Sequence, residues 1–289
     1  MPDPTQPLPS PPLPSQGRGQ ELDVLYRDEF LAVVDKPAGL MVHDSKLARG
    51  ESDFAADRLR EQFDTRIFLV HRLDRATSGC LLLAFDRDTA SALGKALMAR
   101  EAPQEAFEKE YLAVCRGWPP EASFVVDHPL DGGPGKPVKK PALTRFECLA
   151  RMELDEPSAG FSTSRYALLR ARPETGRFRQ IRRHLKHLSH HLIGDTSHGD
   201  GRHNRIFRMR GVQRMLLHAS RLSFVHPQDG RRIVVDAPVD AGFARALAMF
   251  GDSVPREVAQ ALHTRDEGGA LACSRADTSA SAEAGRANR

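Results

Sequence analysis

Short apolar runs, several of them alternating with polar residues, predict many β-strands along this chain. The expected strands are 22–26, 30–34, 80–85, 109–115, 124–127, 143–149, 166–171, 216–225 and 233–235. The last two are separated by HPQDGR, whose Pro227, Asp229 and Gly230 are typical of a hairpin turn. We therefore expect these two strands to form a β-hairpin.

Apolar residues at spacings of three and four predict helices between some of these strands. The expected helices are 53–63, 89–98, 178–188 and 241–250. In the third helix the apolar positions are Ile181, Leu185 and Leu188. Because many strands adjoin one another with few helices between them, we expect an α+β domain with a largely antiparallel sheet and not a doubly wound one.

The two ends of the chain differ from the rest in composition. Residues 1–20 contain seven prolines and little apolar bulk, and residues 264–289 are rich in Ala, Ser and Gly without periodicity. We expect both to be disordered tails around one folded domain at 21–263. No apolar run approaches the roughly 18 residues of a membrane-spanning helix, and no secretory signal is present. The default expectation is a cytoplasmic monomer.

Charge is distributed unevenly along the chain. The net charge is only +4, yet residues 165–232 contain 16 Lys and Arg against four acids, Glu174, Asp195, Asp200 and Asp229. Such a basic block is typical of a protein that binds a polyanion, and RNA or DNA is the commonest one. The alternative is a basic segment neutralised in space by acids from elsewhere in the chain.

The stretch HRLDRATSGCLLLAF, residues 71–85, sets Asp74 between two apolar runs. A buried carboxylate without a partner costs several kcal/mol or becomes protonated, so Asp74 needs an explanation. One possibility is a solvated turn at RATSG. The other is a carboxylate held beside a guanidinium, which stays ionised and can act as a nucleophile or base. No second carboxylate of the kind used in glycoside hydrolysis accompanies it.

HRLDRATSG closely resembles the central motif H-R-L-D-x-x-T-S-G of the RluA-type pseudouridine synthases. Further landmarks follow in the family's order: VVDKPAGLMVH, KEYLAVCRG, PETGRFRQIRRHL, IGDTSHGD and MLLHASRLSFVHP. Together they cover most of residues 21–236. The resemblance implies the pseudouridine synthase fold, with flanking helices and a central RNA-binding cleft. It also implies an isomerase without cofactor or metal, because the uracil that leaves the ribose is also the group that rejoins it.

The resemblance assigns roles to individual residues. Asp74 corresponds to the family's essential carboxylate, Arg182 to its guanidinium partner, and Tyr111 to the aromatic ring that stacks on the extruded uracil. For substrate binding it implies Arg72, Ile181 and Thr77. Arg72 matches the position that fills the space left by the flipped base, and Ile181 supplies an apolar wall. Helical spacing places Arg179 and Arg183 on faces that overlap that of Arg182, and we expect some of these cations to contact phosphates. Arg179 replaces a His that is common in the family. Without the resemblance, Tyr111 and Ile181 would be interpreted as core residues.

The sequence following the third helix narrows the expected substrate. QIRRHLKHLSHHLIGDTSHGDGRHNR is similar to a subgroup of the family that modifies a uridine in the T stem of tRNA, at standard position 65. The landmarks also begin near the start of the folded region, without a preceding S4-like RNA-binding domain. Both features favour tRNA. A ribosomal-RNA synthase of the same family and a non-catalytic RNA-binding protein on the same fold are the alternatives.

A cluster of histidines suggests a third class, a metal-dependent hydrolase. His184, His187, His190 and His191 are close in sequence, but no H-E-x-x-H motif or thiolate pair accompanies them. The four cysteines are widely separated and form no C-x-x-C. We expect the histidines to be hydrogen-bonded neutral residues or part of an RNA-facing surface, and we expect no metal.

Overall fold

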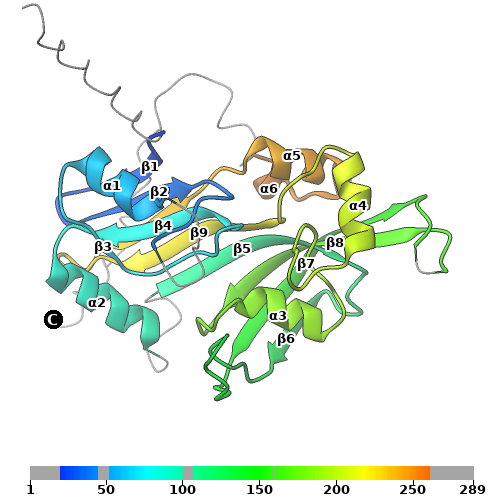
Figure 1. Ribbon diagram of the computed structural model, residues 1–289, viewed down its shortest axis with the longest axis horizontal. Coiled ribbons are helices and arrows are strands. Elements are labelled where there is room, and N and C mark those ends of the chain that lie inside the picture. Colours follow the sequence, from blue (N-terminus) through cyan, green and yellow to red (C-terminus); the bar gives the residue numbers. More distant parts are fainter. Residues whose placement is uncertain (1–19, 45–51, 100–106, 159, 261–289) are drawn as a thin grey trace, which may run out of the picture.

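The structure is a computed structural model that describes residues 20–44, 52–99, 107–158 and 160–260. Its strands are β1 (Asp23–Arg27), β2 (Leu31–Lys36), β3 (Phe68–Leu69), β4 (Ser78–Ala84), β5 (Phe107–Arg116), β6 (Ser123–Asp127), β7 (Leu143–Leu154), β8 (Ser164–Pro173), β9 (Leu217–Val225) and β10 (Arg232–Asp236). They form one ten-stranded sheet in the order β1-β2-β4-β9-β5-β8-β7-β6, with β10 beside β9 and β3 beside β4 (Figure 1). The expected tails lie outside the described residues, except for Gln20.

The sheet is largely antiparallel, which confirms the predicted α+β class. Among the described strands, β4 and β9 form the parallel pair, and the remaining pairs are antiparallel. The predicted hairpin is present, with β9 and β10 pairing antiparallel and Gly230 adopting a φ of 73° in the turn. Positive φ suits glycine because it has no Cβ to clash with the backbone.

Six α-helices are described around this sheet: α1 (Ala55–Phe63), α2 (Arg87–Met98), α3 (Gln180–His187), α4 (Gly201–Met209), α5 (Ala241–Ala248) and α6 (Arg256–Gln260). A short 3-10 helix, η2, spans Gly251–Ser253. The four predicted helices are confirmed within a few residues, whereas α4 and α6 were not predicted. None of the described helices has both the length and the apolarity needed to cross a bilayer.

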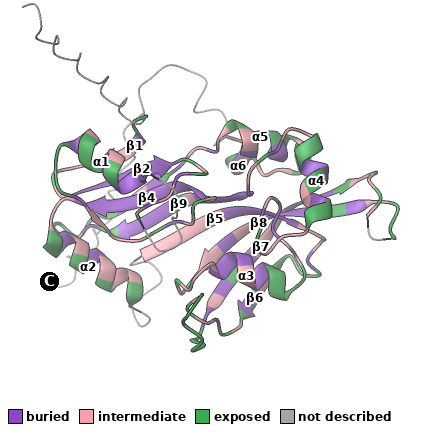
Figure 2. Ribbon diagram, viewed as in Figure 1, coloured by how far each residue is buried: buried purple, intermediate pink, exposed green. Residues whose placement is uncertain are grey.

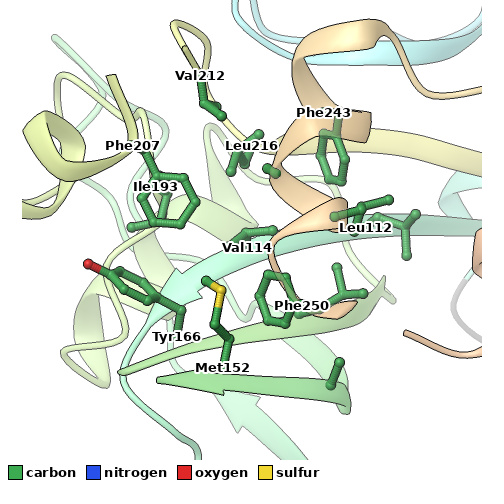
Figure 3. Packing of buried hydrophobic residues seen from close by; sticks show 14 of the residues in the cluster. Leu112, Val114, Met152, Tyr166, Ile193, Phe207, Val212, Leu216, Phe243 and Phe250 are labelled. Carbon is green, nitrogen blue, oxygen red and sulfur yellow. The ribbon is translucent and has the colours of Figure 1, made fainter. Parts of the chain in front are cut away.

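The helices pack on both faces of the sheet because the strand side chains alternate between them. On β5, Leu112 and Val114 face the cluster that contains Phe207 of α4 and Phe243 of α5 (Figure 3). Ala113 and Cys115 point the opposite way and pack with Ile181 and Leu185 of α3. β4 and the second half of β5 are therefore buried on both sides and are purple in Figure 2, whereas the first half of β5 is half-buried and pink. The α3 face is the one that carries the candidate site.

The junction between β4 and β9 requires a glycine directly after the Asp74 loop. Gly79 pairs with Ala219 and has a φ of 106°. A Cβ built on Gly79 would lie 2.2 Å from the carbonyl oxygen of Ala219, which is a backbone atom with little freedom to move. Close approach of the two strands at this point therefore depends on the absence of a side chain.

We expect Gly79→Ala to destabilise the protein by roughly 3 kcal/mol or more, since it combines a strained φ with a backbone overlap. Gly135→Ala is the matched control, because Gly135 also has a positive φ of 74° but open space around its Cβ position. The control should cost about 1–2 kcal/mol from the left-handed conformation. Urea unfolding of both variants measures the difference, and equal losses would contradict the close approach.

Candidate active site

Asp74 lies in a turn between β3 and β4. The backbone N–H of Thr77 donates to the carbonyl of Asp74 at 3.0 Å, which closes the turn. Leu73 beside it is buried in the core that packs against α1, while the Asp74 side chain keeps 24% of its surface exposed. Asp74 is thus neither buried in a strand nor freely solvated, and it lies in the turn that leads into β4.

The end of β2 and the segment that follows it, residues 36–40, fix this turn through hydrogen bonds. The Gly39 N–H donates to the carbonyl of Arg75 at 2.8 Å. The fully buried Lys36 Nζ lies 2.7 Å from the carbonyl oxygen of Pro37, 2.8 Å from that of Leu40 and 3.3 Å from that of Arg75. Burial lowers the pKa of Lys36 to about 7, although the nearby carboxylates of Asp35 and Asp74 oppose the effect. These bonds fix the backbone immediately after Asp74.

Arg182, from α3, is the ion-pair partner of Asp74. Its Nη1 donates to Asp74 Oδ2 at 2.6 Å, across 108 positions of sequence. Its Nε and Nη2 donate to Asp195 Oδ2 and Oδ1 at 2.7 and 2.8 Å, a bidentate pair. The Arg182 side chain is 6% exposed and that of Asp195 is 0% exposed. One buried guanidinium therefore joins two carboxylates.

Asp195 is a functional candidate that the sequence reasoning missed. Its Oδ1 also accepts the backbone N–H groups of Ser197 and His198, at 2.8 and 2.9 Å. Burial would raise its pKa, but the hydrogen bonds and charge of Arg182 and these two N–H groups outweigh burial and hold the pKa below its ordinary value. The ionised Asp195 fixes the orientation of the guanidinium that faces Asp74. Its position in a loop-like stretch, GDTSHGD, gave no such signal.

Tyr111 faces a bulge in the neighbouring strand β9. Glu110 pairs with Arg221 and Leu112 with His218, so two β9 residues, Ala219 and Ser220, oppose the single Tyr111. Tyr111 itself pairs regularly with Ala171 on β8. Bulges are over-represented next to active sites. Burial, and then the Asp74 carboxylate, raise the pKa of Tyr111 well above its ordinary value, so its phenol stays neutral.

A cavity of about 680 Å³ opens over Asp74, Arg182 and Tyr111. This volume lies in the range of sites for small organic ligands, and a nucleotide is of that size. Four of the five predicted substrate-binding residues also line it: Arg72, Thr77, Arg179 and Ile181. The structure thus brings together residues from β5, the β3–β4 turn and α3 that are distant in sequence.

Arg179 and Arg183 behave differently although they are neighbours in sequence. Arg179 precedes α3 in the left-handed conformation, with a φ of 52°, and its guanidinium lies 4.8 Å from the centre of the Phe178 ring. A non-glycine residue rarely adopts this conformation. Arg183 instead pairs with Asp131, whose Oδ2 accepts from Nη2 at 2.8 Å, and it does not line the cavity. Any contact of Arg183 with substrate therefore lies outside this cavity.

The basic block at 165–232 is in large part neutralised in space. Arg170 and Arg172 pair with Glu110, Arg210 with Glu156, and Arg214 with Asp240. All of these acidic partners lie outside residues 165–232. The excess of positive charge counted along residues 165–232 of the sequence therefore overstates the basic surface. The cations that line the cavity are the ones relevant to binding a polyanion.

The clustered histidines make separate hydrogen bonds. His184 is buried, with Nδ1 3.0 Å from the hydroxyl of Thr144 and Nε2 3.1 Å from the carbonyl of His128, and burial lowers its pKa. His190 bonds the carbonyl of Arg116, and His191 that of His198. Across the described ranges, no group of three His, Cys, Asp or Glu residues is arranged to hold a metal ion. This arrangement supplies no observation in favour of a metal-dependent hydrolase.

The family comparison agrees with the geometry of this site. The family described as RNA pseudouridylate synthase matches residues 30–187, which contain Asp74, Tyr111 and Arg182. The chain belongs to this family, and it is an enzyme of the isomerase class. Asp195 lies just beyond the matched residues.

Several curated relatives carry one particular name. The chain is 41% identical over 240 residues to "tRNA pseudouridine synthase C" of Vibrio cholerae, covering 80% of this chain and 96% of that protein. It is 39% identical over 240 residues to the protein of the same name from Salmonella typhimurium, covering 80% and 90%. Among solved structures, "Human RNA Pseudouridylate Synthase Domain Containing 1" superposes with a TM-score of 0.57 at 26% identity, covering 76% of this chain and 84% of that one. These likenesses agree with the pseudouridine synthase fold expected from the motifs.

Proposed function

We propose that this protein converts a uridine of tRNA to pseudouridine, with Asp74 as the essential carboxylate. The observation that carries the proposal is the Asp74–Arg182 ion pair at the floor of a nucleotide-sized cavity, with Tyr111 in its wall. The reaction breaks the N1–C1′ bond of uridine, turns the freed uracil and rejoins it to the ribose through C5. It needs no cofactor, because the uracil serves as both leaving group and nucleophile.

The carboxylate of Asp74 begins the reaction by attacking the substrate or removing a ribose proton. For this it must be ionised and poorly hydrated at once, and a fixed guanidinium reconciles the two requirements. Arg182 is held by Asp195 at two points, so its third N–H direction stays aimed at Asp74. This preorganisation means that little reorganisation is needed as charge shifts during the reaction.

The cavity receives the uridine after it has left the RNA stack. Extrusion of a base costs a few kcal/mol, which contacts in the cavity must offset. Tyr111 stacks on the uracil face and Ile181 closes the opposite side with an apolar surface, while the exposed Arg72 enters the vacated space in the RNA. Thr77 and Arg179 contact the nucleotide from the cavity rim.

The proposed substrate is tRNA, and the proposed target is position 65 in the T stem. The names of the relatives at 39–41% identity support tRNA, and the sequence that follows α3 supports the T stem. A helical stem hides its uridines, which agrees with a site that needs a flipped base. The partly exposed Arg183 and the exposed Lys186 of α3 contact phosphates of the stem.

The test is to incubate the purified protein separately with unmodified tRNA, 16S rRNA and 23S rRNA, and to map pseudouridine by carbodiimide treatment and primed reverse transcription. We expect a new stop at one T-stem uridine of tRNA and none in either rRNA. Modification of rRNA alone would transfer the protein to the ribosomal branch of the family. Tight binding of tRNA without any modified base would indicate a non-catalytic RNA-binding protein.

A further inference from the structure

Lys109 is a cation in the cavity wall that the proposed chemistry does not use. It lies near the start of β5, two residues before Tyr111, and both residues line the cavity. Successive side chains of a strand alternate, so Lys109 and Tyr111 share one face and stand roughly 7 Å apart along the strand. Lys109 therefore lies at the end of the cavity formed by α2, whereas α3 and Arg182 form the other end.

The neighbours of Lys109 on the same strand are fully engaged. Glu110 accepts from Arg170 at 3.0 Å and from Arg172 at 2.8 Å, and Glu108 pairs with Arg172 at 3.1 Å. These acids point to the opposite face of β5 and balance their charge there. No hydrogen bond or ion pair joins the Lys109 Nζ to any of the residues that the structure describes.

The surroundings of Lys109 leave its charge uncompensated within the described part of the chain. Lys109 interacts electrostatically with His71, whose Nε2 accepts a hydrogen bond from the Leu82 N–H at 3.1 Å. Burial, and then the charge of Lys109, lower the pKa of His71 to about 4, so this imidazole is neutral. Burial also lowers the pKa of Lys109 to about 8. A half-buried ammonium without an anion is costly and gains free energy when one binds.

We propose that Lys109 binds a phosphate of the target nucleotide and so fixes the backbone end of the extruded uridine. This inference rests on the proposed function and names a further substrate contact for the same cavity. The spacing between Lys109 and Tyr111 suits one nucleotide, with the uracil on Tyr111 and its phosphodiester on the ammonium. A phosphate is the anion that the substrate itself brings into this cavity, and it accepts readily from an ammonium donor.

Lys109→Met tests the proposal in the full-length protein with tRNA. Because the contact is made in the bound state before and during the reaction, we expect KM to rise about tenfold while kcat changes less than about threefold. The salt dependence of binding should become less steep: the slope of log affinity against log salt should decrease in magnitude by about one, as expected for the loss of one phosphate contact. Lys109→Arg should restore most of the affinity. Lys95→Met, an exposed lysine of α2 outside the cavity, is the control for the change in net charge.

A second measurement identifies which phosphate of the tRNA Lys109 contacts. A tRNA is assembled by ligation with one neutral methylphosphonate linkage on the 5′ or the 3′ side of the target uridine. At one of these linkages the wild-type protein should lose about as much affinity as Lys109→Met loses with normal tRNA, and Lys109→Met should lose nothing further. Equal losses by both proteins at both linkages, or a fall in kcat with unchanged KM, would overturn the phosphate contact. Conversion of normal tRNA by the wild type, run in parallel, tests the proposed function separately.

Discussion

Replacing Asp74 with alanine should abolish pseudouridine formation, with a fall in turnover of at least about 10⁴-fold. The affinity for tRNA should change less than about threefold, because we expect most of it to come from phosphate contacts made by other residues. The fold should persist as well. Arg182 keeps both hydrogen bonds to Asp195 when Asp74 is removed, so no buried charge is left without a partner. Turnover is measured on unmodified tRNA, and affinity by filter binding.

Glu174→Gln is the matched control for this variant. Glu174 is another carboxylate of the cavity wall, but it is exposed and pairs with Arg145 at 2.5 Å. We expect its loss to alter turnover by no more than about threefold, since exposed ion pairs contribute little. Undiminished turnover in Asp74→Ala would end the assignment of Asp74 as the reacting carboxylate. A comparable loss in both variants would point to cavity charge in general.

The strands were predictable because short apolar runs are a local property of the sequence. The runs that predicted β4, β5 and β8 are strands in the structure. Helix α4 was not predictable from its sequence, because GRHNRIFRM has apolar residues only in its second half. It forms because the Asp200 side chain caps the Arg202 N–H at 3.0 Å and Phe207 packs into the core. Support of this kind comes from tertiary contacts and does not appear as a periodic pattern of apolar residues in the sequence.

The site itself divides in the same way. Asp74, Tyr111 and Arg182 were identifiable through motif resemblance, and local chemistry alone left each with an ordinary structural interpretation. Their proximity depends on β4, β5 and α3 meeting across the sheet, which no short-range pattern encodes. Asp195 escaped because an Asp in a turn-rich segment is usually solvated. Its complete burial and its two bonds to Arg182 exist only once the chain has folded.

Arg182→Met should depress kcat by about 10²–10³-fold, because it removes the preorganised charge beside the reacting carboxylate. It should also destabilise the protein by roughly 3–5 kcal/mol, since it leaves the fully buried Asp195 carboxylate without its guanidinium. The affinity for tRNA should fall much less than kcat. Urea unfolding and single-turnover rates on tRNA measure the two effects independently.

The double variant Arg182→Met/Asp195→Asn separates these two roles of Arg182. Asp195 Oδ1 accepts hydrogen bonds from the backbone N–H groups of Ser197 and His198, and the side-chain oxygen of an asparagine can accept them too. Removing the unpaired charge should therefore recover most of the lost stability while kcat stays as low as in Arg182→Met. Recovery of both quantities would mean that Arg182 acts through stability alone. A loss confined to affinity would contradict its pairing with Asp74, because charge beside the carboxylate is needed for turnover and not for docking the RNA.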